Sequence, residues 1–252
     1  MLTVRTTPRV DRAIVVAVIL AVVAVAWAYL FVLTAAVGEM GSSLAMPMTA
    51  DWTLRDWVFM AAMWSVMMIG MMLPSASPMI VSYRSFARTG SLKGSTPVFA
   101  AGYLVAWVGL AVVAAAGQWA LHNVALVSAM GVATTPVAGA FLVGAGAFQF
   151  TKLKRACLGK CRTPMGFLMT QWRDGRRGAL VMGVRHGVYC VTCCWALMAL
   201  LFVLGVMNLA WVAVLAAIVL MEKVAPRPDV LTRVLGAGLV TWGSWLIVGG
   251  FL

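Results

Sequence analysis

Long runs of apolar residues, separated by short polar segments, make up most of this chain. The first run, residues 13–37, is built almost entirely from valine, alanine, leucine and aromatic residues. It is longer than the apolar segment of about 7–15 residues in a signal peptide, so it predicts a retained transmembrane helix. The whole pattern predicts an all-α protein, a polytopic transmembrane helix bundle whose seven spans lie near residues 13–37, 56–73, 97–119, 136–151, 185–204, 207–222 and 233–251.

The composition supports this interpretation and limits the number of domains. Of the 252 residues, 63% are hydrophobic and only 10% are charged, a balance that the surface of a soluble domain would not tolerate. The longest polar stretch, residues 152–178, is a basic connector too short to form an independent core. We therefore expect residues 1–252 to form a single integral-membrane domain.

The basic residues predict an orientation. Under the seven-span interpretation, all but one of the 19 lysines and arginines fall on one side of the membrane, and the exception is Arg55. Because cytoplasmic loops are rich in lysine and arginine, we expect the N-terminus inside and the C-terminus outside. The net charge of +12 then orients helices and contacts anionic lipid. We therefore expect a bacterial inner-membrane location and no binding of nucleic acid.

Methionines form one face of the second predicted helix. Met63, Met67 and Met71 recur at steps of four residues, with Met72 on the flank, so their thioethers line one side. Such a face often serves only as adaptable packing, although leucine and valine would pack a membrane helix equally well. Thioethers differ from these side chains in their affinity for soft ions such as Cu(I). The face is therefore either packing or part of a path for metal.

Two cysteines lie in the basic connector. Cys157 and Cys161 are four residues apart, which puts both thiols on one face of a helix. The surrounding lysines and arginines are expected to lower the pKa of these thiols and so to favour thiolates. The alternative is a pair of small interfacial residues in a reducing compartment.

The fifth predicted helix holds the densest group of soft ligands. His186, Cys190 and Cys193 share one face with Met182, within a sector of about 80° at about 100° per residue, and Cys194 lies at its edge. A lone histidine here would indicate only a hydrogen bond between helices. Imidazole and thiolates together are suited to Cu(I) or Zn(II), so this face predicts a metal site.

The predicted topology brings candidate ligands together at the cytoplasmic ends of several helices. Pro74 and Pro78 are expected to end the second helix at that side, and Glu222 ends the sixth. An ion pair with Lys223 is the alternative role for the Glu222 carboxylate. The candidate metal ligands are His186, Cys190, Cys193, Cys194, Cys157, Cys161, Met63, Met67, Met71, Met72, Met182 and Glu222.

The segments that carry these residues resemble an uncharacterised bacterial family described as predicted metal-binding integral membrane proteins. The resemblance rests on residues 63–78, 153–162, 183–198 and 222–223, which together extend over most of the chain from residue 55 onward. This family tends to have proline where Lys152 stands and glycine where Thr192 stands, and neither difference removes a candidate ligand. The resemblance implies association with a metal ion. It indicates the family to which the chain is similar, but it gives no mechanism.

The leading hypothesis is a copper-handling protein that binds Cu(I) for transfer, sequestration or delivery, with zinc as the second candidate ion. Its expected partners are the lipid bilayer, the metal ion, and a metallochaperone or subunits of a membrane complex. Two alternatives stay open: a thiol–disulfide oxidoreductase that uses Cys190 and Cys193, and a scaffold or assembly subunit. The chain has no Gly-x-x-x-x-Gly-Lys-Ser/Thr loop and only two histidines, so we expect neither an ATP site nor a Ser-His-Asp catalytic arrangement, and the leading hypothesis assigns no catalytic residue.

Overall fold

The structure is a computed structural model that describes residues 8–40, 52–87, 95–126, 128 and 133–249. These described ranges are almost entirely helical and contain no strand, so the all-α prediction is confirmed. The helices are α1 (Pro8–Met40), α2 (Leu54–Ala87), α3 (Thr96–Asn123), α4 (Thr135–Gln149), α5 (Lys152–Arg162), α6 (Pro164–Gln171), α7 (Gly175–Ala199), α8 (Leu201–Leu204), α9 (Leu209–Val224) and α10 (Pro228–Gly249).

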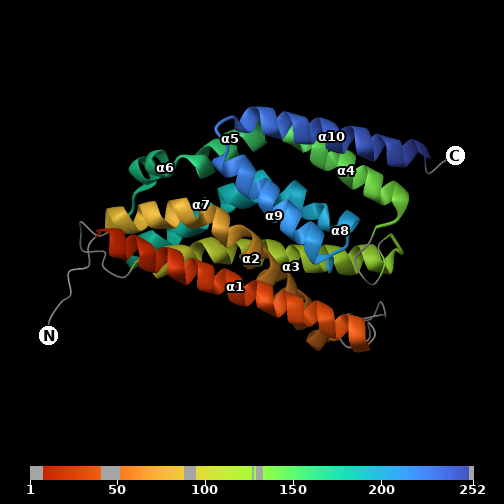
Figure 1. Ribbon diagram of the computed structural model, residues 1–252, viewed down its shortest axis with the longest axis horizontal. Coiled ribbons are helices and arrows are strands. Elements are labelled where there is room, and N and C mark those ends of the chain that lie inside the picture. Colours follow the sequence, from red (N-terminus) through yellow and green to blue (C-terminus); the bar gives the residue numbers. More distant parts are fainter. Residues whose placement is uncertain (1–7, 41–51, 88–94, 127, 129–132, 250–252) are drawn as a thin grey trace.

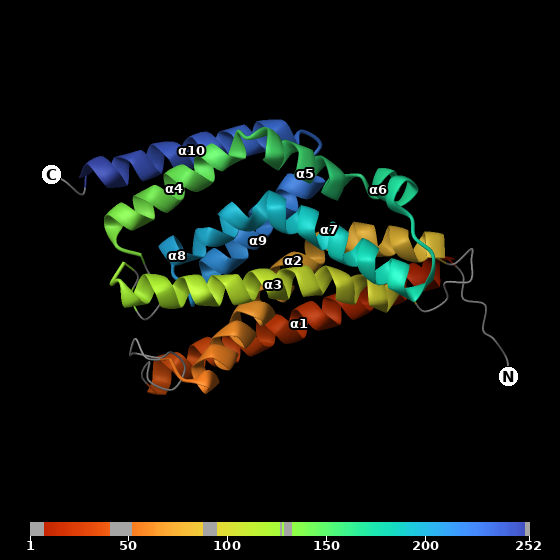
Figure 2. The ribbon, with the colours of Figure 1, turned by 180° about the vertical axis from the view of Figure 1, so that it is seen from behind.

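The helices form two packed groups with α9 between them. In one group α2 packs against both α1 and α3, and α3 packs along α7. In the other group α4 packs along α10. The shorter helix α9 contacts α2 on one side and α10 on the other, and α5 contacts both α7 and α9. Figure 2 shows the same arrangement from behind, with α9 enclosed by the longer helices.

Glycines allow the close contact between α3 and α7. A Cβ atom at Gly183 would collide with the carbonyl oxygen of Phe99, and one at Gly102 would collide with the carbonyl oxygen of Leu180. Helix backbones approach this closely only where small residues line the interface. The packing places the α7 face that carries His186 against aromatic side chains of α3.

The described residues contain five helices that are long and apolar enough to cross a membrane, judged by length and composition. They are Arg9–Ala36, Leu54–Ala87, Thr96–Asn123, Gly175–Leu204 and Pro228–Gly249. The fourth and sixth predicted spans correspond to α4 and α9, which have 15 and 16 residues. At about 1.5 Å per residue, such helices are shorter than an apolar core of about 30 Å. The count of seven spans, and with it the predicted orientation, is therefore not confirmed.

The prediction that two prolines end the second helix is wrong, because α2 continues through both Pro74 and Pro78. A proline leaves a carbonyl oxygen one turn earlier without its usual backbone donor. The carbonyl oxygens that Pro74 and Pro78 leave without a backbone donor are those of Gly70 and Pro74. Between them, Ser75 Oγ and Tyr103 Oη donate to the carbonyl oxygen of Met72, at 2.8 and 3.1 Å. Local hydrogen bonds and packing against neighbouring helices let a buried helix continue past proline. α2 changes direction near its middle (Figures 1 and 2).

A tight turn after α8 sends α9 back along α7. Gly205 has a φ of 88°, in the left-handed region that glycine adopts without steric cost. Asn208 then caps α9 by accepting a hydrogen bond from the backbone N–H of Trp211 at 3.5 Å. As a result, the last residues of α9 lie beside the middle of α7, where Lys223 meets Cys190.

Replacement of Gly183 by alanine is expected to separate α3 from α7 and to lower the free energy of unfolding by about 1–3 kcal/mol, because the new methyl group has no space. Thermal unfolding of the detergent-solubilised protein measures this loss. Gly109→Ala on α3 is the matched control, since a Cβ there meets nothing within 4 Å. A Gly183→Ala protein as stable as the Gly109→Ala protein would contradict the close packing.

Candidate metal centre

Four of the five cysteines meet where α5 and α7 come together, and we call Cys161, Cys190, Cys193 and Cys194 the thiol cluster. The three cysteines of α7 are at most 1% exposed, and Cys161 of α5 is 9% exposed. The Sγ atoms of Cys193 and Cys194 lie 3.2 Å apart, and the Cys193 thiol donates to the carbonyl oxygen of Cys190 at 3.1 Å. Cys161 lies close enough to Cys190 and Cys193 for its thiol to interact with theirs, where α5 packs against α7. All four are free cysteines.

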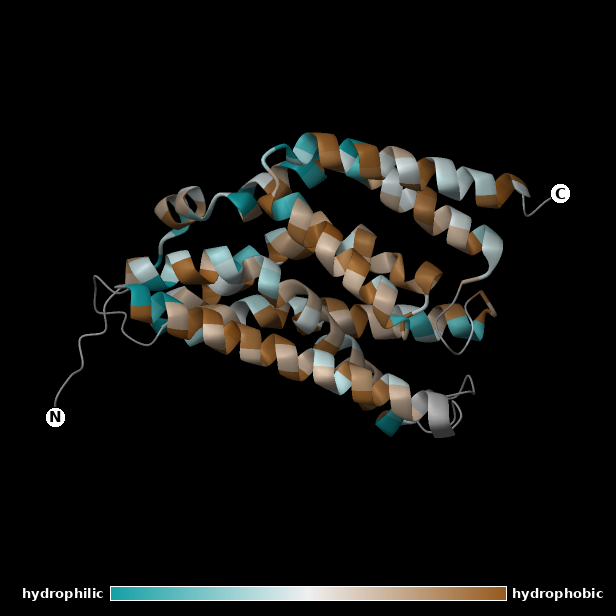
Figure 3. Cartoon of the chain, viewed as in Figure 1, coloured by the Kyte–Doolittle hydropathy of each residue, from teal (hydrophilic) through white to brown (hydrophobic). Residues whose placement is uncertain are grey.

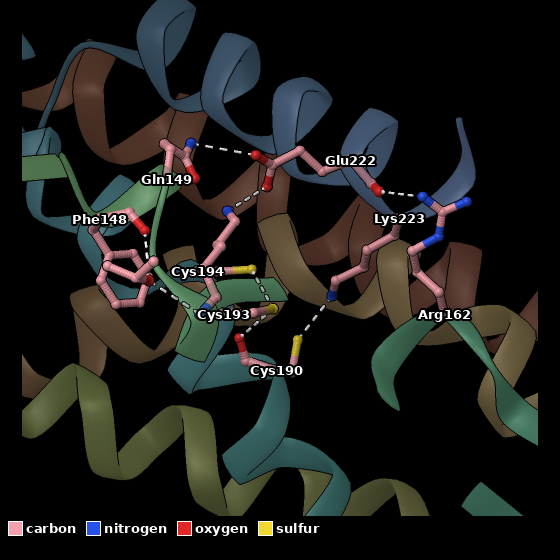
Figure 4. A network of polar contacts seen from close by, with 10 residues as sticks. Phe148, Gln149, Arg162, Cys190, Cys193, Cys194, Glu222 and Lys223 are labelled. Atoms are coloured by element: carbon pink, nitrogen blue, oxygen red, sulfur yellow. Dashed lines mark hydrogen bonds and ion pairs between the residues drawn. The ribbon is translucent and has the colours of Figure 1, made fainter. Parts of the chain in front are cut away.

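A lysine at the end of α9 reaches into the thiol cluster. Lys223 Nζ lies 2.8 Å from Cys190 Sγ (Figure 4). It also donates to Ser75 Oγ at 2.7 Å. The hydroxyl group of Tyr103 lies 3.2 Å from the same sulfur atom. An ammonium group at this distance stabilises a thiolate inside an apolar bundle. Cys190 is therefore the member of the cluster best placed to carry a negative charge.

His186 lies one helical turn before Cys190, enclosed by aromatic rings. Its ring centroid is 5.4 Å from that of Phe167, 5.7 Å from that of Tyr103 and 6.3 Å from that of Phe99. The side chain is buried, and its Nδ1 atom has no hydrogen-bond partner. A buried polar atom without a partner costs about 1–3 kcal/mol, so it calls for an explanation. A soft metal ion is a partner of suitable chemistry for an imidazole nitrogen at this position.

Two sets of polar contacts hold α5 against the end of α9. Lys154 Nζ donates to Glu222 Oε2 at 2.7 Å, both side chains are fully buried, and Gln149 Nε2 donates to Glu222 Oε1 at 3.2 Å. At the other end of α5, the guanidinium group of Arg162 donates to the backbone carbonyl oxygens of Glu222 and Ala225, at 3.3 and 2.5 Å. Because Arg162 follows Cys161 directly, this attachment holds Cys161 against the thiols of α7.

The expectation that basic neighbours lower the pKa of the two α5 thiols is wrong. Burial raises the pKa of the Cys157 thiol, and the nearby Lys160 only partly opposes this effect. Hydrogen bonding to Cys190 is the main cause that raises the pKa of the Cys161 thiol. Both thiols face the protein, whereas Lys160 is exposed to solvent. At Cys157, desolvation therefore outweighs the charge of Lys160.

The methionines predicted as ligands all lie in the core of the bundle. Each of the five is at most 1% exposed: Met63, Met67, Met71, Met72 and Met182. The backbone of Met72 approaches the thiol cluster, because Tyr103 contacts both the Met72 carbonyl oxygen and Cys190 Sγ. The methionine face of α2 is thus directed into the bundle, where it is part of the same hydrophobic core as the cysteines.

The other candidate ligands have different surroundings. Glu222 is held by Lys154 and Gln149 rather than by Lys223, so the alternative ion pair with Lys223 is not formed. Within the described ranges, no group of three or more histidine, cysteine, aspartate or glutamate side chains is arranged to hold a metal ion. The predicted ligand set therefore remains a prediction, of which the structure brings four thiols together.

Two residues that contact the thiol cluster, Lys223 and Tyr103, were not among the candidates predicted from the sequence. Lys223 was considered only as an ion-pair partner of Glu222. A signal for Lys223 was present, since a lysine just after an apolar run that has no turn residues can lie within the protein. Tyr103 had no such signal, because a phenol suits many positions in a membrane helix.

Comparison with known families adds a decisive observation. The family model described as PpoB2, copper chaperone, matches residues 61–246 of the chain. The chain belongs to the PpoB2 family. No curated protein and no solved structure matches it in two further comparisons. This match supports the prediction of a copper-related protein. The description of the family does not mention a membrane, so it does not test the predicted membrane location.

The PpoB2 match includes every residue of the thiol cluster. Lys223, Tyr103, Ser75 and His186 also lie within residues 61–246. All of α1 lies outside the matched range, since α1 ends at Met40 and the match begins at residue 61. The contacts described above are thus made by the part of the chain that carries the similarity to copper chaperones.

Replacement of Glu222 by glutamine is expected to lower the free energy of unfolding by about 3–5 kcal/mol, because it leaves the buried Lys154 ammonium without a counter-charge. Chemical unfolding in detergent measures this loss. The double variant Lys154→Met/Glu222→Leu is expected to recover most of it, since it removes both charges. Lys152→Met, at an exposed position on α5, is the control. A Glu222→Gln protein as stable as this control would show that the ion pair is unimportant.

Proposed function

We propose that this chain is an integral-membrane copper chaperone that takes up Cu(I) as its cargo on the thiol cluster. The observation that carries the proposal is the convergence of Cys161, Cys190, Cys193 and Cys194, from two helices, in the interior of the bundle. Thiolates are soft ligands that favour Cu(I). Membership of a copper-chaperone family supports the same ion.

Zinc is the less suitable cargo for this cluster. Structural zinc sites almost always have four ligands in a closed tetrahedral arrangement. The described side chains offer no arrangement of three or more such ligands. Cu(I), in contrast, is satisfied by two thiolates in a nearly linear arrangement. Cys190 is the first of these ligands, because its thiolate is stabilised by Lys223, and the adjacent thiols supply the second.

Residues on α5 suggest how copper enters and leaves. Cys161 belongs to a short helix at the edge of the bundle, whereas the other three thiols lie deeper on α7. Copper exchanges between proteins when an incoming thiolate replaces an outgoing one. In our proposal Cys161 is the thiol that meets the donor or acceptor, which is a metallochaperone or a subunit of a membrane complex. The buried methionines and His186 then serve as auxiliary soft ligands.

Exposed apolar side chains support location in the membrane. Val25, Val113, Val234 and Trp245 are 65–70% exposed on three of the five long apolar helices. Lipid satisfies such side chains, whereas water does not. In Figure 3, hydrophilic residues gather around the first turns of α1 and α7 and around α5, and the middles of the long helices are hydrophobic. In our proposal, this hydrophilic side faces the cytoplasm of a bacterial cell, in accord with the positive-inside rule.

The two alternative hypotheses gain no such support. Neither a thiol–disulfide enzyme nor a scaffold subunit is indicated by the family match. Cys190 is paired with Lys223, and Cys193 donates to the carbonyl oxygen of Cys190. Copper transfer therefore accounts best for the free thiols in the bundle.

The double variant Cys190→Ser/Cys193→Ser is expected to weaken Cu(I) binding by at least about a hundredfold. Mutation of a residue that only hydrogen-bonds to a metal ligand already costs up to about a hundredfold in affinity, and this variant removes the ligands themselves. Competition with a Cu(I)-specific chelator, on protein purified in detergent under reducing conditions, measures the affinity. Cys157→Ser is the matched control, because Cys157 lies outside the thiol cluster, and it should bind copper like the unaltered protein. Retention of full copper affinity by the double variant would contradict the proposed function.

The membrane location has its own test. After alkaline carbonate washing of cell membranes, the protein is expected to remain in the pellet, because integral helices stay in the bilayer when peripheral proteins are released. Immunoblotting of the pellet and the wash measures the distribution. Recovery of the protein in the wash would contradict an integral-membrane chaperone.

A further inference from the structure

Lys223 is a buried cation that has no carboxylate partner within the part of the chain that the structure describes. Its side chain belongs to the core, and the adjacent carboxylate, Glu222, is already paired with Lys154 at 2.7 Å. The polar contacts of Lys223 Nζ are Ser75 Oγ and Cys190 Sγ. Only the sulfur atom of these two can carry a negative charge. The Cys190 thiolate is therefore the counter-ion of Lys223.

This pairing fixes the charge that the thiol cluster can hold. A buried charge without a counter-charge is costly in an apolar interior, and removing one partner of a buried pair leaves the other uncompensated. When a metal ion binds, the ion, the thiolates and Lys223 must therefore sum to a charge near zero. Two thiolates, one monovalent cation and the Lys223 ammonium reach this sum. Two thiolates with a divalent cation and the same ammonium leave an excess positive charge.

With Lys223 protonated, a divalent ion reaches neutrality only with a third thiolate. Within the described residues, no three such side chains are arranged to hold one ion, so the third ligand would require rearrangement of the cluster. A monovalent ion reaches neutrality with two thiolates. The hydrogen bond from Lys223 to Ser75 Oγ, at 2.7 Å, also keeps the ammonium in place when Cys190 Sγ binds metal. The charge thus remains beside the bound ion.

We propose that Lys223 is a positioning and specificity-determining residue, a built-in counter-charge that makes the thiol cluster select monovalent soft cations, Cu(I) and Ag(I), over divalent ones. The inference rests on the proposed function, because it assumes that the thiol cluster binds the metal. It adds the basis of selectivity, which lies in a residue that is not itself a ligand. Lys223 contacts Cys190 and acts through the charge balance of the site.

Lys223→Met tests this role, since methionine fills a similar volume and removes the charge. Replacement of a buried charge by an apolar residue of similar volume is usually tolerated. Two thiolates alone then neutralise a divalent ion, and a monovalent ion leaves an excess negative charge. The selectivity, expressed as affinity for Ag(I) divided by affinity for Cd(II), is expected to fall by at least about tenfold. The reason is that one unit charge close to the bound ion changes its binding free energy by an amount that corresponds to at least about tenfold in affinity.

The measurement uses the full chain in detergent, made metal-free under reducing conditions, with Cu(I), Ag(I), Cd(II) and Zn(II) each offered alone against chelators. Lys223→Arg, which keeps the charge, should retain the selectivity of the unaltered protein. Lys152→Met removes the same charge from an exposed position on α5 and should also leave the selectivity unchanged. A Lys223→Met protein with unaltered selectivity would overturn the proposal.

The unaltered protein supplies a second measurement that does not depend on folding of a variant. Ag(I) and Cd(II) are both soft ions but differ in charge, so the unaltered protein should bind Ag(I) more tightly by at least about tenfold. Equal affinities would overturn the counter-charge proposal while leaving copper binding intact. Failure to bind either monovalent ion would overturn the proposed function as well. The two failures are therefore distinguishable.

Discussion

The need to neutralise positive charge inside an apolar bundle governs the centre of this structure. α9 ends with two consecutive ionisable residues, Glu222 and Lys223, and both are buried. Adjacent residues on a helix point about 100° apart, so the two side chains face different neighbours. Glu222 meets the ammonium of Lys154, and Lys223 meets the sulfur of Cys190. The end of α9 therefore takes part in two ion pairs. The Lys154–Glu222 pair holds α5 in place, and the Lys223–Cys190 pair stabilises a thiolate.

These two pairings depend on each other through α5. The Lys154–Glu222 pair and the contacts of Arg162 attach α5 to α9, and this attachment holds Cys161 against the cysteines of α7. Loss of the Lys154–Glu222 pair would therefore release Cys161 from the thiol cluster as well as destabilise the fold. In the proposed function the protein must both hold and release copper, and a thiol on a separate short helix is suited to that task.

The core around this centre is rich in adaptable side chains. Methionines of α2, aromatic rings of α3 and the cysteines of α7 belong to the same hydrophobic core. Thioethers adjust their shape easily and are weak soft ligands, so the same side chains are suited both to packing and to binding a passing Cu(I) ion. The unpartnered Nδ1 of His186 fits this environment, because an apolar aromatic surround offers it no other partner.

The sequence by itself determined what depends on local periodicity. Apolar runs predicted helices because an apolar backbone segment must satisfy its own hydrogen bonds, and a step of three or four residues put His186, Cys190 and Cys193 on one face. Only the tertiary structure decided how Pro74 and Pro78 are accommodated, that α4 and α9 are short, and that burial outweighs the basic charges near Cys157. The pairing of Lys223 with Cys190 also came from packing, through the turn at Gly205 that returns α9 along α7. Periodicity acts within one helix, whereas charge pairing joins residues of different helices, so residue spacing alone contains no information about it.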